Sequence, residues 1–409
     1  MRQLAGWDLA AWRMAKSDPT LRSTVVGIVE LASVVPTDII LERIHAVVER
    51  EPALRSIIVD DDNGAVIKEI NAIEVHRHIQ IPERVMDVSG ALSKFAEAEF
   101  DPDRPLWRTL IINTGQHTLL ATAFHHAIAD GQAAMMMLSQ LLDNPPSLPQ
   151  VEQPRSQERA EKSFKESARP VVDRMLKDPV GLTGDISRVV QSINSLLQVP
   201  LSAKAPARSP HFHFAAWEFD KRQTTLSIHD GVVAAAVDAW HSYTSHTSVV
   251  VNVPVAGYEV GGSNRFMIAR LKLQASPHDP AHVAADSKDA LKRWRNEPAA
   301  ALLPQILNMA QYVPPAMLST VLKQGEITVS TVRGANGEAS IGGVAVQRVV
   351  PMVSPIGVAL NITTAVLGDH VMIGITADGA VFPTRSAAIS AVESGLLRVF
   401  GFLPARIIF

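Results

Sequence analysis

The sequence predicts a mixed α/β protein built as two similar sandwiches side by side, with a functional cleft between them. Three observations favour this architecture. The chain has 409 residues, more than one hydrophobic core usually covers. Strand and helix signals alternate in both halves, and a stretch of prolines, glutamines and charged residues separates the halves. We therefore predict a first domain over residues 1–143, a linker with crossover helices over 144–208 and a second domain over 209–409.

The first domain alternates strands and helices. Thr24–Leu31 is β-branched and strand-like. A helix over residues 38–50 has Thr37 as its predicted cap and Pro52 as its stop. The following elements are a hairpin over 54–59 and 65–70, a helix over 89–100, a strand pair over 106–113 and 117–124, and an almost wholly apolar helix over 132–142.

The second half repeats this alternation after a helical stretch over residues 171–199. Its predicted strands cover 212–219, 248–254, 266–273, 327–332, 344–350, 357–365 and 370–376, with a turn at 367–369 between the last two. Its predicted helices cover 231–243, 281–295, 304–312 and 384–400. The shared pattern indicates two domains of similar build.

Composition disfavours several classes of protein. The net charge is −3, whereas a nucleic-acid binder carries a strong basic excess or patch. Cysteine is absent, which removes disulfides, thiolate nucleophiles and cysteine-ligated zinc. The sequence has no G-x-S-x-G, G-K-[ST], H-E-x-x-H or G-x-G-x-x-G motif, which disfavours serine hydrolases, P-loop enzymes, zincins and dinucleotide enzymes.

The N-terminal residues do not resemble a targeting segment. Asp8 interrupts the first 14 residues where a signal peptide needs an unbroken apolar run. No run of 18 apolar residues predicts a membrane-spanning helix. We expect a cytoplasmic protein, and peripheral contact with a membrane or lipid stays open.

Residues 125–131, H-H-A-I-A-D-G, are the strongest chemical signal in the sequence. They lie after a predicted strand and before a predicted helix, where loops present catalytic groups on a rigid scaffold. A neutral imidazole can accept a proton at cellular pH, and a hydroxyl or amine that attacks a thioester carbonyl needs such a base. Gly131 leaves room for substrate or backbone to approach. Asp130 can brace the loop by pairing with a cation.

This motif resembles the signature of the superfamily that contains chloramphenicol acetyltransferase, condensation domains, and carnitine and plant alcohol acyltransferases. Further segments, in their order along the chain, resemble those of bacterial wax ester synthase/diacylglycerol acyltransferases, and the chain is also similar to polyketide-associated acyltransferases. They are R-P-L-W at 104–107, I-H-D-G-V-V at 228–233, G-S-N-R at 262–265, S-T-V-R-G at 330–334 and the strands over 350–378. The resemblance implies two chloramphenicol-acetyltransferase-like domains with a channel between them.

By motif position, the resemblance implies that His126 is the general base and that Asp130 is a structural residue held by an arginine. His125 and Gly131 would support the motif. The candidate substrate-channel residues are Trp107, His229, Ser330, Thr331 and Asn361, of which the last three are positional candidates for oxyanion donors. No metal, cofactor or acylated side chain is implied, because the thioester and the acceptor would meet at His126 from opposite ends of the channel.

The sequence also departs from the family pattern. Where an arginine often follows V-P-V, this chain has Ala256-Gly257-Tyr258. Arg265 and Arg108 are therefore alternative partners for Asp130. The plant-type D-F-G-W-G segment is missing, which disfavours that branch.

Some of these residues have structural interpretations too. Trp107 is more often a core or channel-wall residue than a specific ligand, and we expect His229-Asp230 to cap the following helix rather than touch substrate. The pair His211 and His213 lacks a nearby third ligand and predicts no metal site. Three methionines at 135–137 favour core packing over an acyl-chain lining.

Three functions are consistent with the sequence. The favoured one is transfer of an acyl group from acyl-CoA to a hydroxyl acceptor, forming an ester. An alternative is transfer from an acyl carrier protein to an alcohol or amine in natural-product biosynthesis. The third is a catalytically silent paralogue that binds an acyl chain or a partner protein, which the intact His126, Asp130 and Gly131 disfavour. No nucleic-acid partner is expected.

Overall fold

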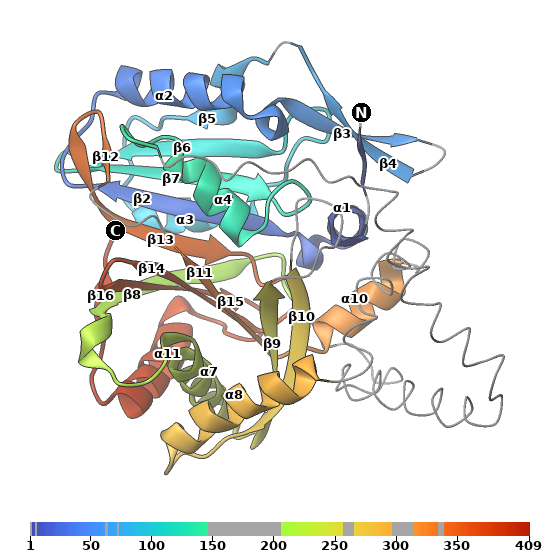
Figure 1. Cartoon of the computed structure of the whole chain (residues 1–409), viewed down its shortest axis with the longest axis vertical. Coiled ribbons are helices and arrows are strands. Elements are labelled where there is room, and N and C mark those ends of the chain that lie inside the picture. Colours follow the sequence, from blue (N-terminus) through green and yellow to red (C-terminus); the bar gives the residue numbers. More distant parts are fainter. Residues whose placement is uncertain are drawn as a thin grey trace.

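A computed structural model describes residues 2–4, 6–61, 64–71, 73–145, 206–256, 266–296, 315–333 and 339–409. Most of the predicted linker, the helices expected over 171–199 and 304–312, and Arg265 lie outside these residues. Two large sheets are stacked, with α2 on the outer face of one and α7, α8 and α11 on the outer face of the other (Figure 1). No helix within the described ranges is long and apolar enough to cross a bilayer.

The first half contains the predicted elements together with the helix α1 and the two-residue strands β1 and β5, which the sequence did not indicate. Its elements are β1 (Arg2–Gln3), α1 (Gly6–Ser17), β2 (Thr24–Leu31), α2 (Thr37–Arg50), β3 (Ser56–Asp61), β4 (Gly64–Glu69), β5 (Ile79–Gln80), α3 (Val88–Glu97), β6 (Trp107–Asn113), β7 (Thr118–His125) and α4 (Gly131–Ser139). Short 3-10 helices cover Pro19–Leu21, Pro52–Arg55 and Val75–His78. Thr37 is the first residue of α2 rather than its cap, because Pro36 occupies the cap position and makes no side-chain cap bond.

The second half follows the predicted order as well. Its elements are β8 (Phe212–Asp220), a 3-10 helix (Lys221–Gln223), α7 (Ile228–Thr244), β9 (Ser248–Ala256), β10 (Phe266–Gln274), α8 (Pro280–Arg295), α10 (Pro315–Lys323), β11 (Ile327–Arg333), β12 (Ser340–Ile341), β13 (Val344–Val353), β14 (Leu360–Leu367), β15 (His370–Asp378), α11 (Arg385–Phe400) and β16 (Ala405–Ile407). The mixed α/β class is as predicted.

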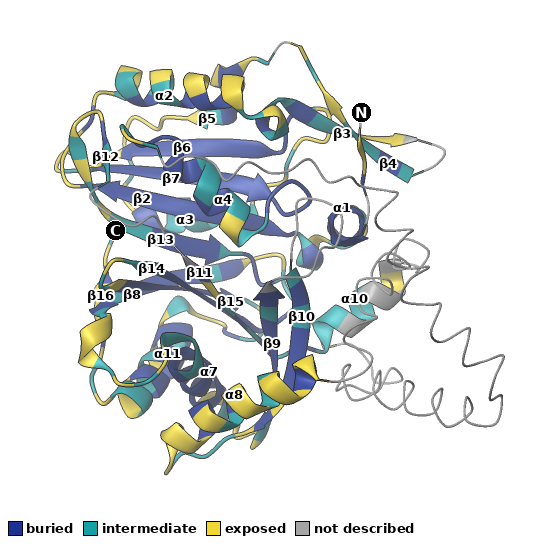
Figure 2. Cartoon of the chain, viewed as in Figure 1, coloured by how far each residue is buried: buried dark blue, intermediate teal, exposed yellow. Residues whose placement is uncertain are grey.

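The described strands form three sheets. One is six-stranded, in the order β12-β13-β2-β7-β6-β5, and one is seven-stranded, in the order β10-β9-β11-β14-β15-β8-β16. A small sheet, β1-β4-β3, lies beside the first. Both large sheets are built largely of buried residues (Figure 2), and each has its own apolar core.

β13 belongs to the first sheet although it comes from the second half of the chain. We predicted residues 344–350 as a strand of the second domain, but β13 runs antiparallel to β2, with Arg348 opposite Glu30 and Val353 opposite Val25. Sheet membership therefore does not follow the division of the chain at 143 and 209. The physical reason is that β2 would otherwise present an unpaired edge, which β13 covers.

β13 also lies face to face with the second sheet. A Cβ placed on Gly374 of β15 would be 1.8 Å from the carbonyl oxygen of Pro351 in β13. Close by, the Thr376 hydroxyl donates to the carbonyl of Val353 at 2.5 Å. The backbones of the two sheets are thus almost in contact, which only a residue without a side chain permits.

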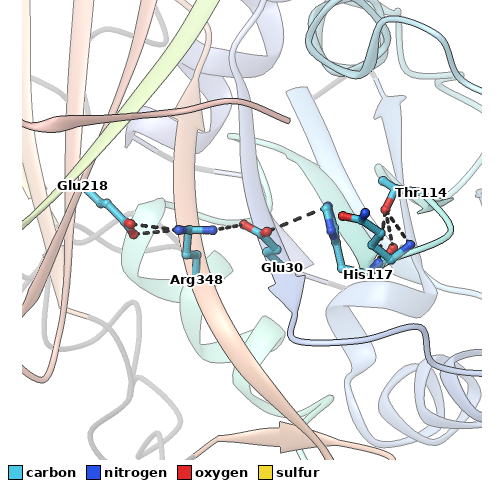
Figure 3. Close-up of polar contacts among 6 residues, drawn as sticks. Glu30, Thr114, His117, Glu218 and Arg348 are labelled. Carbon is cyan, nitrogen blue, oxygen red and sulfur yellow. Dashed lines mark hydrogen bonds and ion pairs between the residues drawn. The ribbon is translucent and has the colours of Figure 1, made fainter.

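Arg348 on β13 joins the two sheets electrostatically (Figure 3). Its guanidinium donates to both carboxylate oxygens of Glu218 on β8, at 2.6 and 2.8 Å, and to Glu30 on β2 at 2.9 Å. His117 lies beyond Glu30, with its Nε2 atom 3.8 Å from that carboxylate. Hydrogen bonds from Arg348 lower the pKa of Glu218 below its usual value, although burial opposes this. The single positive charge of Arg348 is thus shared by two carboxylates at the junction.

Gly374→Ala should destabilise the protein by about 3 kcal/mol, because the new methyl group requires the two sheets to separate. Thermal unfolding would measure the loss. Gly90→Ala in α3 is the matched control, since its methyl meets the movable end of the Asp87 side chain. Equal stability of the two variants would contradict the close contact of β13 and β15.

Arg348→Met should lower the free energy of unfolding by about 2 kcal/mol at neutral pH, because it leaves two partly buried carboxylates without a cation. The depressed pKa of Glu218 stabilises the fold above its usual value of 4.5, and this contribution is lost as pH falls. The difference from wild type should therefore shrink below about pH 4.5.

Chemical denaturation at several pH values would test this dependence. Arg222→Met is the control, since Arg222 pairs with Asp220 on the exposed surface and should matter little. A loss in Arg348→Met that stays constant with pH would contradict the ionic role.

Candidate active site

The loop of the motif is fixed by its own backbone and by Asp130. β7 ends at His125, the Ile128 N–H donates to the His125 carbonyl at 3.0 Å, and α4 begins at Gly131. Asp130 is the N-cap of α4, with extended backbone and a carboxylate that accepts from the Ala133 N–H at 2.8 Å. The aspartate therefore defines where the strand-end loop becomes helix.

His125 is buried and packs against residues of the first half of the chain. It is 5% exposed, and its Nδ1 accepts the N–H of Ala127 at 3.0 Å. The rings of Trp12 and Phe100 meet it edge-on, with centroids 5.7 and 5.8 Å away. Burial, together with the charges of His126 and Arg108, lowers the pKa of His125 to about 3. This imidazole is neutral at cellular pH and is a weak base.

Arg108 is not the partner of Asp130. Its guanidinium donates to carbonyls at the end of α3, to Phe95 and Ala98 at 2.7 Å and to Glu99 at 3.4 Å. It also lies 4.0 Å from the centroid of the Phe100 ring. Its positive charge interacts favourably with the negative, C-terminal end of the α3 dipole. The other candidate, Arg265, lies outside the described residues.

His126 lies at the junction of the two halves. Its N–H donates to the Ser23 carbonyl at 2.8 Å, which ties it to the start of β2. Its ring faces Phe266 of β10, with centroids 5.5 Å apart, and Phe266 in turn contacts Trp7 of α1 at 5.9 Å. The residue is 6% exposed. A substrate that reaches this imidazole therefore passes between side chains of both halves.

Gly131 allows the second sheet to approach the motif. A Cβ at this position would lie 3.0 Å from Cγ1 of Val332 on β11. We expected room here for substrate or backbone, whereas the group that occupies the space is a valine side chain. β11 is thereby held against the first turn of α4.

Ser330 and Asn361 are brought together on one face of the second sheet. The Ser330 hydroxyl donates to Thr363 Oγ1 at 3.0 Å, and Thr363 donates to Asn361 Oδ1 at 3.0 Å. Because side chains alternate along a strand, Ser330 shares its face with Val332, the residue that contacts the motif. Thr363, which the sequence analysis missed, links the two.

Thr331 and His229 lie on the opposite face. His229 Nδ1 is 3.1 Å from Thr331 Oγ1, and burial lowers the pKa of His229. His229 and Asp230 do not cap α7, because Ser227 is at the cap position and they lie in the first turn. The structure thus separates Thr331 and His229 from Ser330 and Asn361.

Trp107 is a core residue of the first domain. It is 2% exposed, its Nε1 donates to the Leu54 carbonyl at 2.8 Å, and its ring stacks on His78 at 4.7 Å. Met135 is buried in the same core. The ring nitrogens of His211 and His213 bond to Glu97 and to the Phe382 carbonyl, respectively.

Two small cavities among the described residues are not lined by His126. One of about 20 Å³ is lined by Trp107, Met137 and apolar neighbours, and one of about 10 Å³ by Arg22, Glu97 and Ser354 among others. Each is about the size of a water molecule. The channel expected between the halves stays a prediction.

Comparison with known proteins gives a family. The model of the wax ester synthase/diacylglycerol acyltransferase catalytic domain matches residues 4–226, and the model of the WS/DGAT C-terminal domain matches residues 262–398. Two relatives are named "Probable diacyglycerol O-acyltransferase tgs2" from Mycobacterium tuberculosis and "Putative diacyglycerol O-acyltransferase" from Mycobacterium bovis. Each is 24% identical over 369 residues, covering 77% of this chain and 78% of the relative.

Solved structures share the fold. The wax ester synthase/diacylglycerol acyltransferase of Marinobacter aquaeolei superposes with a TM-score of 0.63 at 16% identity, covering 96% of this chain and 98% of that one. A mutant starter condensation domain of rhizomide synthetase, in complex with C8-CoA and Leu-SNAC, gives 0.63 at 12% identity and covers 99% and 95%. The two chloramphenicol-acetyltransferase-like domains implied by the motif are confirmed at the level of the fold.

Asp130→Ala should destabilise the protein by about 1 kcal/mol, because α4 loses its side-chain cap. Asp130→Asn can still accept the Ala133 N–H and should retain this stability. Thermal unfolding of both variants separates the cap from the charge. Equal losses in the two would show that the negative charge of Asp130, rather than its hydrogen bond, stabilises the loop.

Proposed function

Because the chain belongs to the wax ester synthase/diacylglycerol acyltransferase family, we propose that it transfers a fatty acyl group from acyl-CoA to the hydroxyl of a lipid alcohol. The protein is an acyltransferase. What we propose is the identity of the acyl donor, the identity of the acceptor and the roles of the residues that act on them. Peripheral contact with a lipid surface, from which a hydrophobic acceptor is taken up, is part of it.

In this proposal His126 is the general base. A ring nitrogen removes the proton of the acceptor hydroxyl as its oxygen attacks the thioester carbonyl carbon. The carbonyl oxygen becomes a tetrahedral oxyanion, which hydrogen-bond donors stabilise. When the oxyanion collapses, the carbon–sulfur bond breaks and the thiolate takes the proton from the imidazolium. The products are an ester and free CoA, and no side chain is acylated.

The observation that supports this role is the position of His126 between the two halves. Its backbone is bonded to β2 and its ring faces Phe266 of β10, so two substrates approaching between the halves would meet there. The neighbouring His125 is neutral and engaged by Ala127. Only one of the two imidazoles is therefore suited to proton transfer.

An acyl carrier protein is the second candidate donor. The starter condensation domain shares this fold over 99% of the chain, and the thioester chemistry at the base is the same for both donors. Donor choice distinguishes the candidates. Palmitoyl-CoA and palmitoyl carrier protein, each offered with hexadecanol or a diacylglycerol, would be compared by mass spectrometry of the products.

His126→Ala should reduce kcat by at least about 100-fold while leaving the unfolding temperature near that of wild type. Ester formation from palmitoyl-CoA would be followed by CoA release and by product mass. His278→Ala, at an exposed histidine of the second half, is the control and should keep wild-type kcat. Undiminished turnover in His126→Ala would remove this residue from the mechanism.

A further inference from the structure

Ser23 lies opposite His126 just beyond the paired ends of β2 and β7. Thr24 at the start of β2 pairs with His125 at the end of β7, so the next pair along the antiparallel strands is Ser23 and His126. The bond from the His126 N–H to the Ser23 carbonyl, at 2.8 Å, continues this register. Residues paired in this way project side chains to the same face, with Cβ atoms about 5 Å apart.

The hydroxyl of Ser23 is buried and has no hydrogen-bond partner among the described residues. The residue is 2% exposed. Its Oγ is one of the few buried side-chain polar atoms among the described residues that make no hydrogen bond. Nearby hydroxyls are satisfied: Ser354 Oγ donates to the Arg22 carbonyl at 2.7 Å and accepts from the Thr24 N–H at 2.9 Å. Burial without a partner is unfavourable, so such a group calls for an explanation.

A second unsatisfied donor belongs to Trp7, which contacts Phe266. Trp7 is 9% exposed, and its Nε1 has no acceptor within the described ranges. Its ring contacts Phe266, which also faces the His126 ring. One buried donor without a protein acceptor is thus bonded through its backbone to His126, and the other contacts the aromatic ring that His126 faces. This arrangement indicates that an acceptor atom enters with a ligand.

We propose that the Ser23 hydroxyl donates a hydrogen bond to the thioester carbonyl oxygen of the acyl donor and stabilises the oxyanion formed there. This inference rests on the proposed function. His126 takes the proton of the acceptor, so the attacked carbon lies close to its ring, and the oxygen on that carbon is within reach of the side chain on the adjacent strand. From the sequence we expected this donor in the second domain, at Ser330, Thr331 or Asn361.

Ser23→Ala should reduce kcat by about 100-fold, as expected for loss of one oxyanion donor, and raise KM by up to about tenfold, because the same hydroxyl also binds the carbonyl oxygen of the donor before reaction. Its unfolding temperature should equal or exceed that of wild type, because the substitution removes a buried hydroxyl that lacks a protein partner. Ser56→Ala is the matched control. That serine is also buried, but its hydroxyl donates to the Pro52 carbonyl at 2.7 Å, so this variant should lose stability and keep kcat.

Two outcomes of these measurements would overturn the proposal. One is an unchanged kcat in Ser23→Ala. The other is a lower unfolding temperature together with a matching loss of activity, which would assign the hydroxyl to the fold.

A binding experiment tests the same contact without turnover. One non-reacting analogue of palmitoyl-CoA has a methylene in place of the thioester sulfur and keeps the carbonyl, and a thioether analogue lacks the carbonyl oxygen. Ser23→Ala should weaken binding of the first about tenfold and leave the second unchanged. Equal effects on both analogues would overturn the proposed contact of Ser23 with the carbonyl oxygen but would leave the proposed function untouched. A wild-type protein that binds both analogues but forms no ester would instead contradict the proposed function.

Discussion

The backbone contact between β13 and β15 is the constraint on which the arrangement of the two halves depends. β13 is hydrogen-bonded to β2 in the first sheet, while the Pro351 carbonyl occupies the space that a side chain at position 374 would need. One strand therefore belongs to one sheet and determines the distance to the other. Because strands in a ladder are rigidly spaced, fixing β13 against β15 also fixes the rest of the first sheet relative to β11. Val332 consequently meets Gly131 at the start of the motif helix.

Buried polar groups in the described part of the chain are of two kinds, those with hydrogen-bond partners and those without. Arg348 is paired with two carboxylates, and Arg108 with three carbonyl groups at the end of α3. Their positive charges are compensated, as burial requires. By contrast, Ser23 and Trp7 have buried donor groups without acceptors in the described part of the chain. Arg348 joins the two sheets and Arg108 closes the end of α3 within the first half. The unsatisfied donors lie instead near the histidine at which we propose the reaction occurs, Ser23 through its backbone bond to His126 and Trp7 through Phe266.

How far the sequence predicts this structure depends on whether a feature is local. Helical spacing of apolar residues identified α2, because it buries one face that its own residues define. β7 and the helix after the motif were identified as apolar segments bounded by turn residues, since β7 is buried along its whole length. α1 was missed since its residues are buried nearly all round, which removes the amphipathic signal. The sheet that β13 joins was not predictable, because alternation specifies faces and not partners. Alternation alone could have separated Ser330 from Thr331, since neighbours on a strand face opposite ways.

The two histidines of the motif show how one scaffold gives like residues different properties. On a strand, consecutive side chains project to opposite faces. His125 accordingly meets Trp12 and Phe100, and its burial beside Arg108 keeps it neutral. That neutrality matters for its neighbour. In the proposed reaction His126 becomes an imidazolium, and a charged ring at position 125 would oppose it by like-charge repulsion. Because burial keeps His125 neutral, no like-charge repulsion opposes the imidazolium that forms at His126 during proton transfer.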